Sequence, residues 1–327
     1  MIFSKEKWNE SGEIKQYIAV SKAISFEKME SPLRNAFDLF LVSLLGESMT
    51  NRLQEIYDSE NRSEREEKLL FLAQRANANL AFWYEFDEIN LRITDSGFQR
   101  QDTESFKSLF KYQEDHLKQN FKNTGFNALD NLLAFLEKET EVFPEYLQSP
   151  AYILFKESIV RNTEEVNGTY FINNSRIVFL RLRTHFDFAE KTFLCPALGD
   201  KLYEELKRRL REGVEDEIQR AKTEELRIRS GRVIIMEAVR RLLMETGSLT
   251  DRGLYFTSIH SGAQTDENEA PVEIERLSSQ VRGAETDREV YLTSLMKYVR
   301  QAFADWYEGN PQKVFDRNND HKRTFWA

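Results

Sequence analysis

The sequence predicts a mainly α protein made of two homologous helical-bundle modules in tandem, with minor β content. Three observations predict this class: an internal repeat, apolar residues at helical spacing, and few residues that form turns. The 327 residues include only 13 Gly and 6 Pro, but 24 Phe and 12 Tyr. Packed helices suit this composition better than a sandwich of many short strands does.

The internal repeat carries most of this prediction. A shift of about 153 positions aligns residues 17–53 with residues 170–206 without a gap. About nine of about 37 aligned positions are identical, whereas unrelated sequences of average composition give roughly two. The identical pairs are Tyr17/Tyr170, Ile24/Ile177, Phe26/Phe179, Ala36/Ala189, Phe40/Phe193, Leu41/Leu194, Leu45/Leu198, Gly46/Gly199 and Leu53/Leu206. We infer the tandem duplication of a module of roughly 150 residues.

Shorter blocks extend the repeat. Residues 91–98 resemble residues 247–254, and residues 143–146 resemble residues 303–306. Ser149-Pro150 is the best boundary between the modules, because this dipeptide favours a turn. The predicted domains are residues 1–149, residues 150–308 and a polar C-terminal tail of residues 309–327.

The first module is predicted to be a series of amphipathic helices. Its first helix has apolar side chains at helical spacing from Phe26 to Leu45, and Gly46 stops or bends it. A later helix carries several alanines between Ala73 and Ala81, which let a neighbouring helix approach closely. The predicted helices contain residues 26–45, 49–57, 66–93, 106–121 and 127–136.

The second module is predicted to repeat this plan. Its first helix ends at Leu198, next to Gly199, which corresponds to Gly46. The predicted helices cover residues 179–198, 200–218, 224–244, 273–281 and 288–307. The minor β content is expected in two strand-like runs, residues 177–179 and 254–259.

A polar turn recurs in both modules, with Asp95 and Gly97 in the first and Asp251 and Gly253 in the second. An Asp that bonds back to the chain and a Gly that accepts positive φ are typical of such turns. We interpret these residues, with Gly46 and Gly199, as structural turns. The alternative is a pair of loops that meet a partner at the same place in each module.

Composition limits the partners. A formal charge of −9 argues against non-specific binding of DNA or anionic lipid by the whole chain. Basic residues are densest between positions 207 and 241, where Glu204 and Glu205 precede Arg208 and Arg209 in the favourable helical order. A salt-bridged exposed face is therefore the favoured interpretation, and a DNA contact of this face is the alternative.

The sequence contains no signature of catalysis or metal binding. It has four His, no pair of Cys, no glycine-rich phosphate loop and no nucleophile elbow. Cys195, the one cysteine, is expected to be a small buried apolar residue. Glu85, Asp87 and Glu88 are interpreted as a solvated face rather than an acid–base pair. We therefore predict no catalytic, cofactor-binding or metal-binding residues.

No export signal or membrane span is evident, which is typical of a soluble globular protein. Two aromatic residues, Phe325 and Trp326, stand near the end of the polar tail. They are candidates for docking into a groove of a neighbouring subunit. Folding back onto their own chain is an equal alternative.

An apolar helix that ends in Leu-Gly occurs twice, as Leu45-Gly46 and as Leu198-Gly199. An amphipathic helix, a further helix and the Thr-Asp-x-Gly turn follow it. In this pattern the chain resembles an uncharacterised family of tandemly duplicated helical proteins associated with prophages and phage structural-gene neighbourhoods. The resemblance covers nearly the whole chain except the tail, and its motifs name no chemistry.

Each module also resembles, more loosely, the phage head–tail connector family of head-completion and adaptor proteins. Members have an N-terminal helix that begins near an acidic residue, carries a central Ala and ends at a Gly, and a later apolar helix with Ala. The matching positions here are Glu27 or Glu30, Ala36, Gly46, and Ala76 or Ala81. The module is longer and doubled, and the Arg-containing end of the connector family's last helix has no clear match.

The resemblance implies a non-enzymatic virion neck protein, located in the virion or in the bacterial cytoplasm. Its expected partners are like subunits, as in a ring, and a portal or tail protein, without a small-molecule substrate, sequence-specific nucleic acid or membrane. Two alternatives stay open. One is a cellular helical adaptor with a protein-binding groove, and the other is an enzyme with acidic residues and His converging in one cleft.

Overall fold

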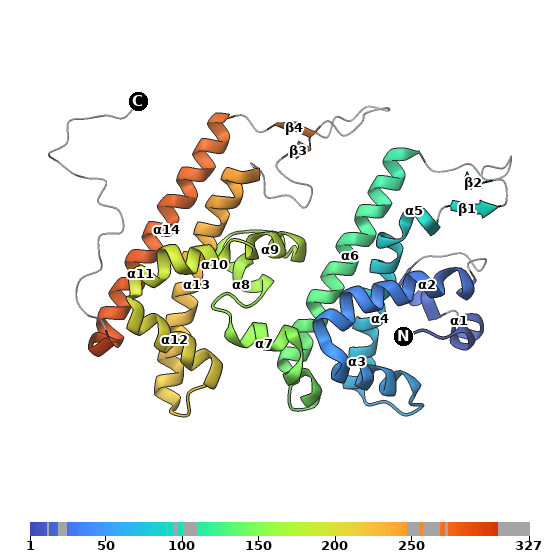
Figure 1. Cartoon of the computed structure of the whole chain (residues 1–327), viewed down its shortest axis with the longest axis horizontal. Coiled ribbons are helices and arrows are strands. Elements are labelled where there is room, and N and C mark those ends of the chain that lie inside the picture. Colours follow the sequence, from blue (N-terminus) through green and yellow to red (C-terminus); the bar gives the residue numbers. More distant parts are fainter. Residues whose placement is uncertain are drawn as a thin grey trace. The chain divides into compact units, whose positions relative to one another are not determined.

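The computed structural model describes residues 1–11, 13–18, 25–89, 91–94, 97–100, 110–246, 255–257, 269–271 and 274–306. This part of the chain is mainly helical and divides into two compact units (Figure 1). Of the described residues, the first unit contains Met1–Phe155 and Asn174–Ile177, and the second contains Lys156–Asn173 and those from Val178 onward. The chain passes from one unit to the other inside helix α7 (Pro150–Glu157).

The first unit is a helical bundle with one short hairpin. Its core is a continuous set of buried apolar side chains drawn from α1 through η3. Its elements are α1 (Lys5–Ser11), η1 (Glu13–Gln16), α2 (Phe26–Ala36), η2 (Phe37–Val42), α3 (Ser43–Asp58), α4 (Glu64–Tyr84), α5 (Phe86–Ile89), β1 (Leu91–Thr94), β2 (Gly97–Arg100), α6 (Lys111–Lys138) and η3 (Pro144–Gln148).

Helix α4 packs along α6, and small residues allow the approach. The α4 alanines Ala73, Ala76 and Ala81 are completely buried, as the sequence predicts. On α6, a Cβ atom added to Gly125 would lie 2.8 Å from Leu80 of α4. The backbone of α6 therefore comes so close to α4 that the contact requires glycine.

The second unit has its own core and pairs α13 with α14 in the way that the first pairs α4 with α6. The elements after α7 are α8 (Thr163–Thr169), α9 (Arg176–Arg183), α10 (Phe186–Ala189), η4 (Glu190–Leu194), α11 (Cys195–Leu198), α12 (Asp200–Glu212), α13 (Glu217–Thr246), β3 (Tyr255–Thr257), β4 (Glu269–Pro271), α14 (Ile274–Ala302) and η5 (Ala304–Trp306).

The two units repeat the same irregular features in the same order. Each has a π-helical turn, η2 or η4, shortly before a glycine in the positive-φ region. Gly46 has φ 71° and ψ 171°, and Gly199 has φ 78° and ψ 150°. The shift that aligns the sequences also aligns these glycines and the first residues of α4 and α13. The tandem duplication is thus visible in the fold, and the predicted helix breaks at Gly46 and Gly199 are confirmed.

In each unit a two-stranded antiparallel pair comes between the two long helices in the sequence, between α4 and α6 in the first unit and between α13 and α14 in the second. Thr94 of β1 pairs with Gly97, the first residue of β2, and Phe256 of β3 pairs with Ala270 of β4. Gly97 is thus the residue at which the second strand of the pair begins. The other predicted turn residues, Asp95, Asp251 and Gly253, lie outside the described residues.

Three predictions of separate elements are wrong. Residues 111–138 form the single helix α6 where two helices were expected, because Gly125 is used for close packing rather than for a break. Residues 274–302 likewise form the single helix α14 across Gly283. The run 177–179, expected to be strand-like, lies in α9, where Val178, Phe179 and Leu182 bury one helical face.

Other boundaries also differ from the prediction. The helix expected over residues 66–93 ends at Tyr84, and the chain continues as α5 and β1. The helix expected to reach residue 218 ends at Glu212, because the next residue, Gly213, has φ 84°.

Candidate interaction surface

The start of each unit is held to its long helix by a buried polar side chain. In the first unit, Gln74 Nε2 of α4 donates to the Ile2 carbonyl oxygen at 2.7 Å and to Glu13 Oε1 at 2.6 Å. Burial raises the pKa of the Glu13 carboxyl above its ordinary value, although this bond opposes the effect. These side chains give the N-terminal segment a fixed place on the bundle.

The second unit has the same arrangement with a different side chain. Arg227 of α13 corresponds to Gln74, and its guanidinium donates to the Ile159 carbonyl oxygen and to Glu165 at 2.7 Å. Sequence reasoning missed this role, because a basic residue in a basic cluster suggested an exposed face. Its side chain is only 3% exposed. The duplication therefore includes the N-terminal segment of each unit.

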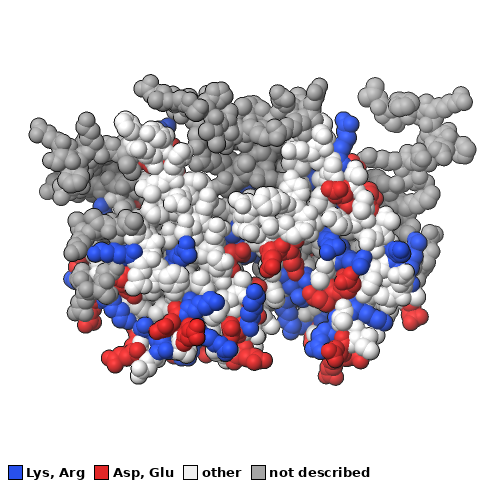
Figure 2. Space-filling view, turned by 180° about the vertical axis from the view of Figure 1, so that it is seen from behind, with Lys and Arg blue, Asp and Glu red and all other residues white. Residues whose placement is uncertain are grey.

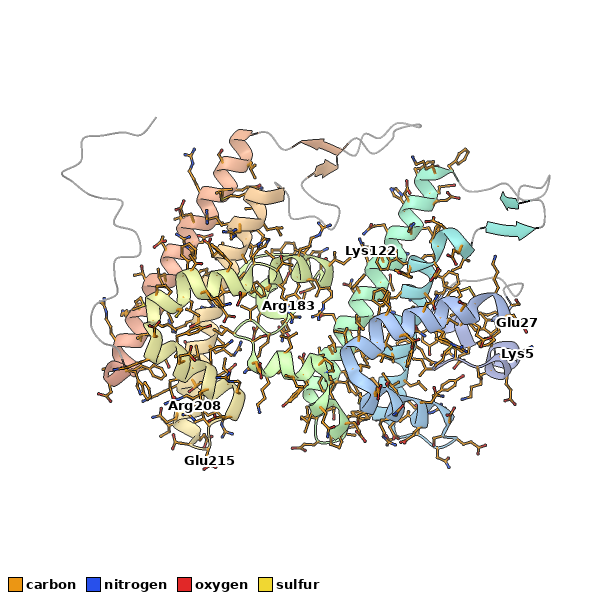
Figure 3. The ribbon with its side chains drawn as sticks, in the orientation of Figure 1. Lys5, Glu27, Lys122, Arg183, Arg208 and Glu215 are labelled. Atoms are coloured by element: carbon orange, nitrogen blue, oxygen red, sulfur yellow. The ribbon has the colours of Figure 1, made fainter. Side chains whose placement is uncertain are left out.

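Several basic residues between positions 207 and 241, among them Arg208, Arg209 and Arg229, pair with acids of their own helices. Glu205 Oε1 accepts from Arg208 at 2.8 Å and from Arg209 at 2.6 Å, so the pairing predicted for Glu205 is confirmed. Hydrogen bonds from these guanidinium groups lower the pKa of Glu205 to about 2. Arg208 lies on α12 in Figure 3, and Figure 2 shows positive and negative side chains intermixed over the lower part of one face.

The carboxylates considered for acid–base chemistry have separate partners. Glu85 accepts from Asn35 Nδ2 at 3.1 Å, and Asp87 accepts from Lys118 Nζ at 2.9 Å. Glu88 is exposed. In the part of the chain that the structure describes, no group of three His, Cys, Asp or Glu side chains is placed to hold a metal ion.

Cys195 is half-buried rather than buried, which corrects the prediction. Its Sγ donates to Asp200 Oδ1 at 3.4 Å. Burial and the nearby carboxylate raise the pKa of the thiol to about 11. The thiol is therefore protonated at neutral pH and is a poor nucleophile.

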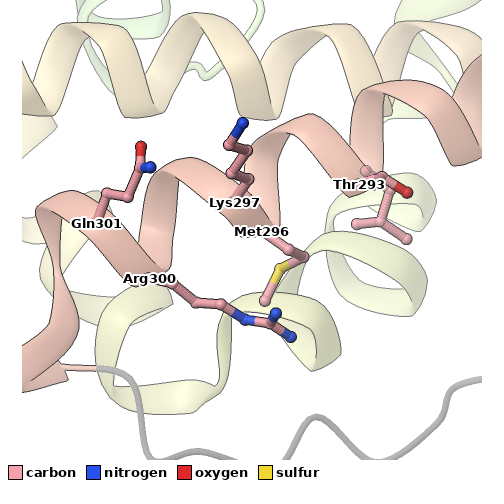
Figure 4. Close-up of a pocket in the computed structure, with 6 residues that line it drawn as sticks. Thr293, Met296, Lys297, Arg300 and Gln301 are labelled. Atoms are coloured by element: carbon pink, nitrogen blue, oxygen red, sulfur yellow. The ribbon is translucent and has the colours of Figure 1, made fainter.

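One open hollow of about 650 Å³ lies along α14 (Figure 4). It is lined by Leu292, Thr293, Met296, Lys297, Arg300 and Gln301. All six residues come from one helix, and none is an acid or a His. The hollow is thus a surface depression of α14 without converging catalytic groups.

An aromatic cluster lies on the first unit at the π-helical turn η2. The ring centroid of Phe40 is 6.0 Å from that of Trp83, 6.0 Å from that of Tyr84 and 5.9 Å from that of Phe126. Trp83 and Phe126 are also edge-to-face at 5.4 Å. These four side chains, from η2, α4 and α6, are called the aromatic surface below.

The aromatic surface is open to solvent. Tyr84 is 53% exposed and the adjacent Leu39 is 46% exposed, while the other three rings are half-buried. Lys122 of α6, labelled in Figure 3, places its Nζ 5.5 Å from the Trp83 ring centroid. The edge-to-face contacts fix the rings before any partner binds. Sequence reasoning missed this site, although Phe40 and the neighbouring pair Trp83-Tyr84 were available as a signal.

The second unit covers the corresponding position. Phe193, which aligns with Phe40, lies on η4, and the guanidinium of Arg288 from α14 is 4.5 Å from its ring centroid. Glu237 of α13, completely buried, accepts a hydrogen bond from Arg288. A second arginine, Arg241, lies 3.7 Å from the ring centroid of Phe188. One fold thus presents a cluster of aromatic rings with an exposed Tyr84 in its first copy, whereas in its second copy the equivalent of Phe40, Phe193, is buried beneath an arginine.

The remaining predicted candidates are placed as follows. Gly46 and Gly199 are turning points of the backbone, and neither belongs to the aromatic surface. Phe325 and Trp326 lie outside the described residues. None of the helices in the described ranges is long and apolar enough to cross a membrane.

Sequence comparison agrees with the repeated geometry. The model of a family of unknown function, DUF6712, matches the chain twice, over residues 41–155 and 194–316. The chain belongs to this family. Each match begins in the π-helical region of its unit and includes the glycine break, so the DUF6712 segment recurs with the structural repeat. No curated protein and no solved structure matches the chain.

Proposed function

We propose that the chain is a non-enzymatic assembly protein that acts through contacts with other proteins. The observation that carries this proposal is the difference between the two copies at Phe40 and Phe193. The second copy, with its ring covered by Arg288, indicates that the fold does not need an open aromatic surface there. A feature that the fold does not need is available for binding.

The composition of the surface supports a protein partner. Tyr, Trp and Phe are enriched at the centres of protein interfaces, where they supply most of the binding energy. Here they are held by edge-to-face contacts, so little side-chain freedom is lost on binding. The polar candidates elsewhere, such as Arg208 and Asp87, are engaged in ion pairs.

The more specific proposal is that the protein belongs to the neck of a phage particle, between portal and tail. The resemblance to duplicated prophage proteins and to head–tail connectors supports this proposal. Like subunits in a ring, and a portal or tail protein, are the proposed partners. The C-terminal residues Phe325 and Trp326 are proposed to contribute to contacts between subunits.

Analytical ultracentrifugation and electron microscopy of the purified full chain test the proposal, alone and with a portal protein from the same genome. Concentration-dependent oligomers, or a complex with the portal protein, are the expected result. A monomer at every concentration that also fails to bind the portal protein contradicts it. Binding to a non-phage cellular protein would favour the adaptor alternative.

A further inference from the structure

We propose that the aromatic surface of the first unit binds the C-terminal segment, residues 307–327, of a second copy of this chain. The proposed contacts are made by Arg323, Phe325 and Trp326. This inference rests on the proposed assembly function and names the surface and the segment that meet. Three observations carry it, beginning with the chemistry of the surface.

The aromatic surface presents ring faces that attract cations. Tyr84 is the most exposed of its rings, and an edge-to-face contact with Phe40 holds it in place. The face of an aromatic ring carries negative electrostatic potential and binds a guanidinium or an ammonium group. Lys122 already uses this property at Trp83.

In the second unit, an arginine covers the ring of Phe193, the residue equivalent to Phe40. Arg288 lies over Phe193, and a side-chain contact with Glu237 fixes the guanidinium. The side chain of Arg288 is only 6% exposed, so this arginine and the ring remove each other from water. In this fold, then, an arginine stacked on the ring is a stable way to cover the aromatic residue of the π-helical turn.

The C-terminal segment contains the required groups next to each other. Its sequence includes Lys322-Arg323-Thr324-Phe325-Trp326, in which two cations adjoin two aromatic residues. An arginine can stack on an exposed ring while neighbouring aromatic side chains pack against the half-buried ones. This segment follows Trp306, the last residue that the structure describes.

The partner is another copy because the proposed function requires self-association. Binding of a surface on one copy by a segment of the next is a heterologous contact, which generates rings or filaments. This geometry agrees with subunits arranged as a ring. Binding between copies predicts oligomers, whereas binding of the segment within its own chain does not.

Disulfide trapping between two full-length chains tests the inference. Both chains carry Cys195→Ser, which removes the one native thiol; one also carries Leu39→Cys, beside the aromatic surface, and the other, labelled with ¹⁵N, also carries Ala327→Cys, so that the proposed contact residues stay in place. The matched control replaces Leu39→Cys by Phe71→Cys, because Phe71 is also an exposed apolar residue of the first unit, 41% exposed against 46% for Leu39. After mild oxidation of the mixture, mass spectrometry identifies the linked peptides.

The expected result is a mixed disulfide with the Leu39→Cys chain at a yield well above that with the Phe71→Cys chain. Equal yields overturn the inference, because they indicate random collision. A disulfide that forms only within a chain carrying both Leu39→Cys and Ala327→Cys, and not between mixed chains, overturns the assignment to a second copy. If oligomers are present in the ultracentrifuge but no specific disulfide forms, the inference fails while the proposed assembly function stands.

A labelled synthetic peptide of residues 307–327 provides an independent measurement. Its affinity for the full chain is expected to fall at least about tenfold with Tyr84→Leu, the loss typical of one hot-spot contact. Replacing Arg323 by Gln in the peptide is expected to weaken binding to the native surface by a similar factor. Unchanged affinity in both variants overturns the stacking contact.

Discussion

At the scale of single residues, two glycines determine where the first helix of each unit turns. Gly46 and Gly199 combine positive φ with extended ψ, a region that side chains other than glycine rarely occupy. Around Gly46 there is also little room, because an added Cβ would lie 3.3 Å from Pro150 Cδ. The sequence predicted both positions from the Leu-Gly repeat.

Replacing Gly46 by Ala is expected to lower the free energy of unfolding by about 2 kcal/mol, because the backbone conformation is strained for Ala. Chemical denaturation of the variant measures this change. The matched control is Gly283→Ala in α14, where an added Cβ meets nothing within 4 Å. The control is expected to raise stability by roughly 0.5–1 kcal/mol through helix propensity. Equal effects of the two substitutions would contradict the proposed strain.

Two buried polar residues occupy the same position of the long helices. Asn77 of α4 and Ser230 of α13 are related by the repeat shift, and both are completely buried. Their side-chain polar atoms have no hydrogen-bond partner within the described chain. Such groups lose water on folding without compensation.

Replacing Ser230 by Ala is therefore expected to raise the free energy of unfolding by about 1 kcal/mol, measured by denaturation. Thr223→Val, on the same helix, is the control. The Thr223 hydroxyl donates to the Gln219 carbonyl oxygen at 2.8 Å and accepts from Arg209, so its loss is expected to destabilise. A destabilising Ser230→Ala would indicate that a buried water molecule satisfies this hydroxyl.

At the scale of elements, the acidic and basic residues of α12 form a local network. Glu205 binds Arg208 and Arg209, and its pKa is lowered to about 2 from an ordinary value of 4.5. A lowered pKa means that the folded state binds the proton less tightly than the unfolded state does. The pairing then stabilises the fold fully above about pH 5, and this contribution is lost as pH falls from 4.5 toward 2.

The melting temperatures of the native chain and of Glu205→Gln, measured from pH 7 to pH 2, test this assignment. The native chain is expected to be more stable at pH 7, and the difference should shrink as pH falls below 4.5. As a control, Glu215→Gln in the exposed loop after α12 is expected to leave the pH profile unchanged. A difference between the native chain and Glu205→Gln that stays constant down to pH 2 would contradict the network.

Periodicity predicts which segments are helical better than it predicts where helices end. The alanine face of α4 was predictable, because small residues at helical spacing favour close packing. The continuity of α6 was not, because sequence alone does not distinguish a glycine that breaks a helix from Gly125, which allows contact with Leu80. The π-helical turns η2 and η4 were also unpredictable, since one inserted residue leaves the apolar pattern nearly unchanged.

At the scale of the whole molecule, the duplication explains the architecture, and the differences between copies indicate function. Gln74 and Arg227 show that the same contact with the N-terminal segment is made by different side chains. Phe40 and Phe193 show the opposite case, in which the same side chain has different surroundings. The exchange between Gln74 and Arg227 preserves the fold, whereas the different surroundings of Phe40 and Phe193 change which side chains are available for binding a partner.

The candidate site was the least predictable part of the molecule. Phe40, Trp83 and Phe126 are far apart in the sequence, and each alone has the pattern of a core residue. Only the packing of η2, α4 and α6 leaves their rings half-exposed on one surface. The spacing of apolar residues along the sequence does not show which of them stay exposed once distant segments have packed together.

Sedimentation velocity of three full-length proteins over a range of concentrations tests the central claim, assembly through the aromatic surface. The proteins are the native chain, Tyr84→Glu and the matched control Phe71→Glu, in which a different exposed aromatic residue of α4 is charged. The native chain and Phe71→Glu are expected to form oligomers as concentration rises, while Tyr84→Glu is expected to stay monomeric. Identical sedimentation of all three proteins would contradict it.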